Sequence, residues 1–128
     1  MSIEAYQSKS TMLVIAEKLG QPVIADDNET VVVLSGLETG HARRIDLIFR
    51  QSVGGGIAAV KVRAYTAGRQ WYYEYQVHGG IAATTYGFTV VDPYSNQTST
   101  HVIGDTIDVV VDNSENNNTI QVWAIARS

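Results

Sequence analysis

Short runs of alternating apolar and polar residues recur along most of this 128-residue sequence. Ile45, Leu47 and Phe49 alternate with mostly charged neighbours, and residues 107–111 repeat the pattern in IDVVV. Successive side chains of a β-strand point to opposite faces, so this period of two predicts strands with one buried face. Clusters of Gly, Asn and Asp separate the runs, at the spacing typical of sandwiches and barrels. The sequence therefore predicts an all-β chain.

About seven or eight such runs can be counted, a number typical of an immunoglobulin-like sandwich or a jelly roll. A chain of this length can bury roughly two-thirds of its unfolded surface in one domain. The hydrophobic fraction of 45% and the charged fraction of 17% are those of a folded protein. We expect a single β-sandwich over residues 30–128, preceded by an N-terminal arm or docking segment over residues 1–29.

The first residues differ in character from the rest. TMLVIAEKLG, residues 11–20, has apolar side chains at helical spacing, with Gly20 and Pro22 as stop signals. The same stretch is short and apolar enough to be a strand, so both interpretations stay open. ADDNE, residues 25–29, is expected to be a loop. The segment before it is expected to dock on the sandwich or on a neighbouring molecule.

Charge and composition exclude several classes of function. The net charge is −4 with only nine Lys and Arg, whereas binding nucleic acid through its phosphates needs a concentrated basic surface. No cysteine is present, which excludes disulfides, thiolate metal sites and cysteine nucleophiles. The start of the chain lacks a basic segment followed by a long apolar run, and no stretch approaches the roughly 20 apolar residues of a membrane span. We expect a soluble protein without a secretion signal, with neither nucleic acid nor membrane as a partner.

Candidate catalytic and metal-binding residues are few. His41, His78 and His101 fall at predicted strand ends or loops, and their spacing matches no zinc pattern. No G-x-S-x-G nucleophile motif occurs. DNSENNN, residues 112–118, offers oxygen ligands for calcium, but it lacks the central Gly and closing Glu of an EF-hand loop. We expect no enzymatic activity, cofactor or metal, and we interpret residues 112–118 as a hairpin loop with calcium as the alternative.

The stretch RQWYYEYQVHGG, residues 69–80, has four aromatic side chains in five positions. Alternation places Trp71, Tyr73 and Tyr75 on one face, which we predict to be core because it is the more apolar face. A row of exposed rings that binds a sugar is the alternative. Other aromatic side chains are predicted to point outward, where Tyr and Trp suit a protein interface. With the apolar residues of the arm, the predicted interface residues are Met12, Leu13, Ile15, Tyr65, Tyr72 and Trp123.

Three stretches together resemble the decoration, or cement, proteins of tailed-phage capsids. They are the arm STMLVIAEKLGQPVIADDNET, the strands VVVLSG and TIDVVVD, and the apolar closing strand TIQVWAIAR. The resemblance implies a homotrimer or dimer that sits on a major capsid protein in the virion and stabilises the shell without chemistry. The alternative is a carbohydrate-binding or receptor-binding module. Such a module would use the aromatic face or the loops at residues 79–83 and 94–100.

Overall fold

A computed structural model describes residues 13–40, 42–93 and 102–128 of the chain. These residues form nine β-strands and one short 3-10 turn, η1 (Ala67–Arg69), and they include no α-helix. The strands are β1 (Val14–Leu19), β2 (Val23–Ala25), β3 (Glu29–Glu38), β4 (Arg44–Gln51), β5 (Ile57–Tyr65), β6 (Tyr72–His78), β7 (Gly87–Val91), β8 (Thr106–Asn113) and β9 (Asn118–Arg127). The all-β prediction is confirmed, with nine strands where about seven or eight were expected. A bilayer-spanning helix is not found in the described ranges.

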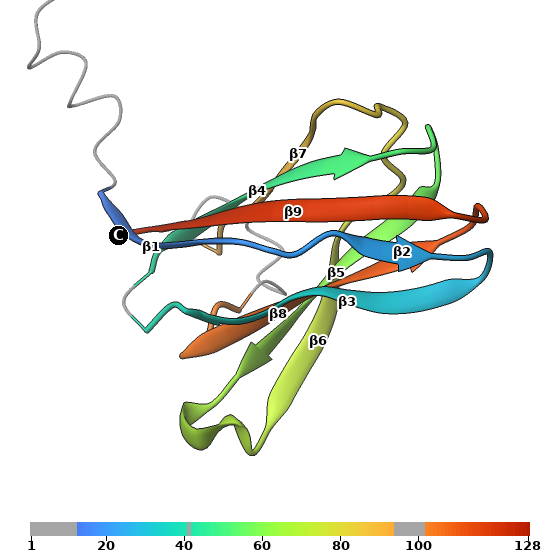
Figure 1. Cartoon of the computed structure of the whole chain (residues 1–128). Helices are drawn as coiled ribbons and strands as arrows, with labels where there is room; N and C mark the ends of the chain where they lie inside the picture. The colour runs from blue at the N-terminus through green and yellow to red at the C-terminus, as the bar shows by residue number, and fades with distance from the viewer. Residues whose placement is uncertain (1–12, 41, 94–101) are drawn as a thin grey trace, which may run out of the picture.

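The strands form two antiparallel sheets that pack face to face (Figure 1). One sheet has the order β1-β9-β4-β7, and we call it the β9 sheet after a central strand. The other has the order β3-β8-β5-β6, and we call it the β8 sheet. β2 pairs with β9 on the edge that β1 also uses, so β1 and β2 act as one interrupted edge strand. The predicted β-sandwich is therefore confirmed.

The pairing scheme identifies the topology. β5 pairs with β6, β4 with β7, β3 with β8 and β2 with β9. The chain therefore behaves as one long hairpin, with the β5–β6 turn as its tip, that is folded over into two sheets. This nested arrangement is the jelly roll, whereas an immunoglobulin-like domain groups its strands differently. The structure thus decides between the two folds that the sequence left open.

The core lies between the two sheets and follows the predicted alternation. Ile45, Leu47 and Phe49 of β4 are buried, and Ile107, Val109 and Val111 of β8 face them from the opposite sheet. These inward positions belong to one contiguous apolar cluster. Burial of such side chains stabilises the fold by about 1.5–3 kcal/mol each.

A buried cluster of three amide side chains closes one end of the sandwich. Asn118 donates from Nδ2 to Gln51 Oε1 at 3.1 Å and to Asn113 Oδ1 at 3.0 Å. Gln51 also donates to the carbonyl oxygens of Ile81 and Ala83. Because buried polar groups must find partners, this network fixes the loops around it.

The arm predicted over residues 1–29 supplies strands over its described part. Residues 14–19 form β1 rather than a helix. Residues 20–22 interrupt the edge strand between β1 and β2. A Cβ atom on Gly20 would lie 2.5 Å from the Val33 carbonyl oxygen, so only glycine allows the backbone this close to β3. Residues 1–12, which include Met12, lie outside the described residues.

Candidate interaction surfaces

A row of large apolar side chains crosses the outer face of the β9 sheet. Leu19 lies opposite Trp123, Trp123 opposite Ile48, and Ile48 opposite Phe88, so the row passes through β1, β9, β4 and β7. Directly opposite residues in a sheet point to the same face. Leu19 is 61% exposed, Phe88 54% and Trp123 41%. We call these four residues the apolar row.

Charged residues flank the apolar row on both sides. On one side, Asp46 is buried beneath two arginines: its Oδ1 lies 2.6 Å from Arg44 Nε and its Oδ2 lies 2.8 Å from Arg127 Nε. On the other side, Arg50 follows Ile48 by two residues on β4, and so points to the same face. Arg50 is exposed and makes no ion pair within the described part of the chain. The apolar row therefore has a positive group available at one flank.

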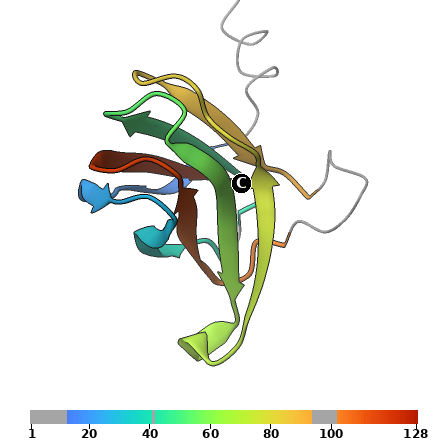
Figure 2. The same cartoon turned by 90° about the vertical axis from the view of Figure 1, so that its right-hand side faces the viewer.

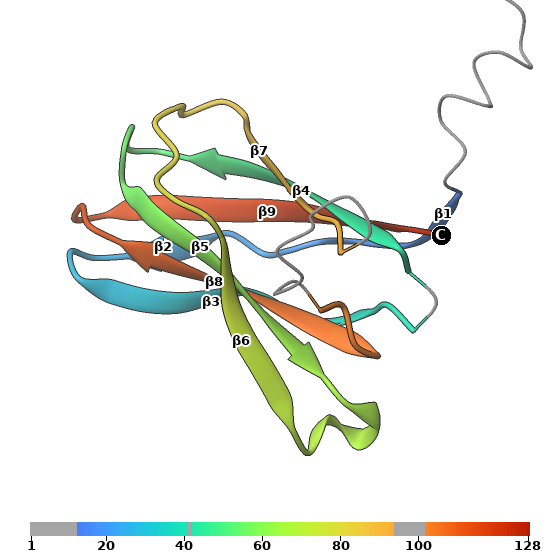
Figure 3. The ribbon, with the colours of Figure 1, turned by 180° about the vertical axis from the view of Figure 1, so that it is seen from behind.

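The β5–β6 hairpin extends past the β9 sheet, as Figures 1, 2 and 3 show from three sides. Tyr75 lies where the two sheets overlap and is buried, but Trp71 is 73% exposed and Tyr73 is 49% exposed. The prediction that this aromatic face is core is thus correct for Tyr75 and wrong for Trp71 and Tyr73. The face is apolar along its whole length, but no second sheet covers its outer end.

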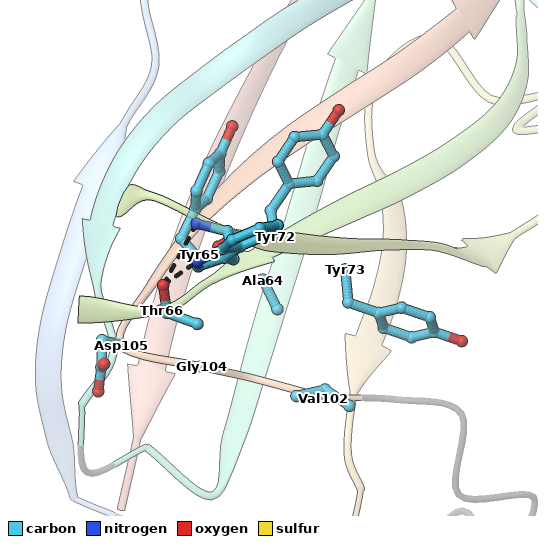
Figure 4. Close-up of a pocket in the computed structure, with 9 residues that line it drawn as sticks. Ala64, Tyr65, Thr66, Tyr72, Tyr73, Val102, Gly104 and Asp105 are labelled. Carbon is cyan, nitrogen blue, oxygen red and sulfur yellow. Dashed lines mark hydrogen bonds between the residues drawn. The ribbon is translucent and has the colours of Figure 1, made fainter. Parts of the chain in front are cut away.

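The uncovered end of the hairpin forms an open groove of about 420 Å³. We call it the tip groove, and its lining includes Ala64, Thr66, Trp71, Tyr73, Val102 and Asp105. Figure 4 shows Tyr73 and Val102 toward one end of the tip groove and Thr66 and Asp105 toward the other. The Asp105 carboxylate makes no hydrogen bond or ion pair with any residue that the structure describes. The groove is therefore mostly apolar, with one acidic group at an end.

Arg69 holds the hairpin tip in place. It donates from Nη2 to both carboxylate oxygens of Asp108 at 2.9 Å, and from Nη1 to Thr106 Oγ1 at 2.9 Å. Its guanidinium carbon also lies 3.9 Å from the centre of the Tyr65 ring, a cation–π distance. Gly68 and Arg69 both have positive φ, which produces the tight turn before Trp71. These contacts fix the tip to β8, in addition to its connection to β5 and β6.

Two ionisable groups near the tip have shifted pKa values. Burial alone would raise the pKa of the Asp108 carboxyl, but the Gly36 N–H, the Arg69 guanidinium and the Ser35 hydroxyl hold it below its usual value. Burial raises the pKa of Tyr75 to about 12. The Tyr75 hydroxyl donates to the carbonyl oxygen of Val102, which fixes one wall of the tip groove.

The outer face of the β8 sheet carries paired charges instead of an apolar row. Lys61 Nζ lies 2.8 Å from Asp112 Oδ2, and Arg63 Nε lies 2.8 Å from Glu74 Oε1. The hydrogen bond with Asp112 raises the pKa of Lys61, and the bond with Lys61 lowers that of Asp112. Both groups therefore favour the charged form, and each neutralises the charge of the other.

The residues predicted as an interface separate into two groups. Trp123 belongs to the apolar row, and Leu13 and Ile15 are exposed at the β1 edge of the same sheet. Tyr65 and Tyr72 lie on the outer face of the β8 sheet, with ring centres 5.2 Å apart. Sequence reasoning missed the remaining members of the apolar row, because they become neighbours only through the register of four strands. The predicted residues Tyr65 and Tyr72 also line the tip groove, but the exposure of the groove was not predicted because it depends on where the β9 sheet ends.

Of the three candidate histidines, one lies among the described residues. His78 is exposed at the end of β6, while His41 and His101 lie outside the described residues. Asp108 is fully engaged with Arg69, Ser35 and Gly36. A group of three or more His, Cys, Asp or Glu side chains suited to a metal ion is not found in the ranges that the structure covers.

Comparison with known proteins gives little sequence similarity. No family model matches the chain, and no curated protein matches it. Among solved structures, a chain in the structure of infectious bursal disease virus Gx strain is similar, with a TM-score of 0.48 and 10% sequence identity. The match covers 87% of this chain and 32% of that chain, so the protein spans about a third of its length.

Proposed function

We propose that the chain is a non-enzymatic structural subunit that joins a larger assembly through protein–protein contacts. The apolar row is the observation that carries this proposal. A line of Leu, Trp, Ile and Phe across a whole sheet places apolar surface in water, and such surfaces mark interaction sites on soluble proteins. Tyr and Trp are also enriched at interfaces, whereas Lys and Glu are depleted.

The finer form of the proposal is a decoration or cement subunit of a virion. Its partners are other copies of the chain, as a homotrimer or dimer, and a major capsid protein. The resemblance of its sequence stretches to tailed-phage decoration proteins supports this form. The self-paired charges of the β8 sheet support it as well, because they suit a face that remains in solvent while the β9 sheet is covered.

Sedimentation equilibrium tests the general proposal. The purified protein should form an oligomer of defined mass, and Trp123→Ser should dissociate it while the circular dichroism spectrum stays unchanged. Val32→Ser is the matched control, because Val32 is 42% exposed on the outer face of the β8 sheet, close to the 41% of Trp123. A wild-type protein that stays monomeric at high concentration would contradict self-association of the chain.

Electron microscopy tests the virion form. Gold-labelled antibody against the chain should mark the capsid surface of particles from the organism that encodes it. Particles treated to release the chain should also lose resistance to heat, and adding the purified protein back should restore it. Particles with no gold label and unchanged heat resistance would rule out a cement role, while leaving self-assembly to the sedimentation test.

A further inference from the structure

The molecule has two separate apolar surfaces, and a symmetric contact would cover only one of them. The apolar row lies on the outer face of the β9 sheet, whereas the tip groove lies on the overhanging β5–β6 hairpin of the β8 sheet. If two copies met row to row, Trp71 and Tyr73 would remain in solvent. If they met groove to groove, Leu19, Trp123 and Phe88 would remain exposed. A contact between unlike surfaces covers both.

The two surfaces are complementary in shape and charge. The tip groove is concave, and the apolar row presents side chains that project from a sheet. The groove carries the Asp105 carboxylate, and the row is flanked by the Arg50 guanidinium. Neither group has a charged partner among the residues described. Complementary charges at the rim of an interface set its register and exclude wrong partners.

We propose that the tip groove of one copy receives the apolar row of the next copy, with Asp105 facing Arg50 across the contact. This proposal rests on the proposed structural function and names the two surfaces that meet. The contact is head-to-tail, so every copy uses its groove toward one neighbour and its row toward the other. Such a contact closes into a ring when the rotation between neighbours allows it.

The groove is suited to this role because hydrogen bonds within the chain hold its tip in place. Arg69 fixes the turn to Asp108 and Thr106, and the backbone N–H of Thr66 donates to the Trp71 carbonyl oxygen at 2.9 Å. A site that is already ordered loses little conformational entropy on binding. Trp and Tyr in a desolvated pocket are also the residue types that supply most of the binding energy at interfaces.

Mixing two variants tests the head-to-tail contact. Trp71→Ser removes an aromatic side chain from the tip groove and keeps the apolar row intact. Trp123→Ser removes one from the apolar row and keeps the tip groove intact. Each variant alone should be monomeric. An equal mixture should form a heterodimer, detected by native mass spectrometry with one variant isotopically labelled, because one intact groove and one intact row remain between the two. Both side chains are exposed, so circular dichroism should confirm that each variant is folded.

The outcomes separate this proposal from the general one. If Trp123→Ser dissociates the oligomer but Trp71→Ser does not, the chain self-assembles without the groove and the head-to-tail contact is wrong. If both variants are monomeric and the mixture yields no heterodimer, the two surfaces do not meet and the contact is again wrong. A glycan that binds the wild type on an array and not the Trp71→Ser variant would assign the groove to a sugar instead.

Charge reversal gives an independent test of the register. Asp105→Arg and Arg50→Asp should each weaken self-association by about tenfold or more, because like charges would then face each other. The double variant restores the opposite charges and should regain most of the affinity. A double variant as weak as the sum of the two single variants would show that Asp105 and Arg50 do not face each other.

Discussion

The β8 sheet buries the apolar side chain at the centre of its outer face, whereas the β9 sheet leaves the one at its centre 41% exposed. Val110 of β8 points outward between Val32 and Lys61, yet it is fully buried. Lysine stems commonly cover apolar surface while the charged head stays at the rim, and here the Lys61 head pairs with Asp112. Trp123 holds the corresponding central place on β9, but its neighbours are Leu19 and Ile48, and it stays exposed.

We infer from this difference that the outer face of the β8 sheet serves stability, whereas the outer face of the β9 sheet serves assembly. Substitutions on the outer face of the β8 sheet should change the free energy of unfolding and leave the oligomeric mass unchanged. Substitutions in the apolar row should do the reverse. Four substitutions test how stability is distributed over the molecule.

Val109→Asp should abolish folding, because it places an unpaired charge in the shared core. Val109 is fully buried and pairs with Val62 and Leu34 at the centre of the β8 sheet. An ionised carboxylate without a partner at such a site costs more than the few kcal/mol that separate folded from unfolded protein. Circular dichroism and size exclusion check the result, with Val109→Ala as a control that should remain folded. A folded Asp variant would place Val109 on an outer face.

Asp108→Asn should reduce the free energy of unfolding by about 2 kcal/mol, since it weakens charge-assisted hydrogen bonds from Arg69, Ser35 and Gly36. The folded pKa of Asp108 is depressed, so its contribution is fully present above the unfolded pKa of about 4. That contribution is lost as the pH falls through the lower folded value.

Urea unfolding at pH 7 and pH 3 measures this effect. The wild type and the Asn variant should differ clearly at pH 7 and less at pH 3. An equal difference in free energy of unfolding at the two pH values would mean that the carboxylate charge does not stabilise the tip. The oligomeric mass should be the same for both proteins, because Asp108→Asn leaves Trp71 and Tyr73 of the tip groove in place. Trp71→Ser should lower the oligomeric mass instead. The two variants therefore separate an effect on stability from an effect on assembly.

Tyr75→Phe should reduce the free energy of unfolding by about 1 kcal/mol, because it removes the hydrogen bond from the Tyr75 hydroxyl to the Val102 carbonyl oxygen. The folded pKa is raised to about 12, so the hydroxyl contributes stability that is present below the unfolded pKa of about 10. This stability is lost as the pH rises through the folded value. Unfolding curves between pH 9 and pH 12 should thus converge for the two proteins, and parallel curves would contradict the assignment.

Glu74→Ala should have the smallest effect, at most about 0.5 kcal/mol, because the pair with Arg63 is partly exposed. Thermal unfolding at low and high salt checks this, and the small difference should shrink as salt screens the pair. A loss above 1 kcal/mol would mean that the charges of the β8 sheet act as a coupled network. The mass of the oligomer should stay unchanged.

Alternation along single strands was enough to predict the fold class and much of the core. Residues such as Leu47 and Ile107 need only their neighbours in sequence to reveal which face they occupy. The choice of a jelly roll over an immunoglobulin-like sandwich depended on pairings such as Val23 with Ile120, nearly 100 residues apart. No local pattern encodes such a pairing.

The candidate surfaces were harder to predict for the same reason. Trp123 was correctly predicted to point outward, but its partners in the apolar row come from three other strands. Trp71 and Tyr75 share one face of β6 and its approach, yet one is exposed and the other buried. That contrast depends on how far the hairpin extends beyond the opposite sheet, which is a property of the whole sandwich.

The strand order also has a consequence for biosynthesis. β9 lies between β1 and β4, and β8 lies between β3 and β5, so the last two strands of the chain are central ones. Neither sheet can close on the ribosome until residues 106–127 have emerged from the exit tunnel. Until then, the nascent chain has unpaired strand edges. Such edges make β-rich chains prone to aggregation and dependent on chaperones.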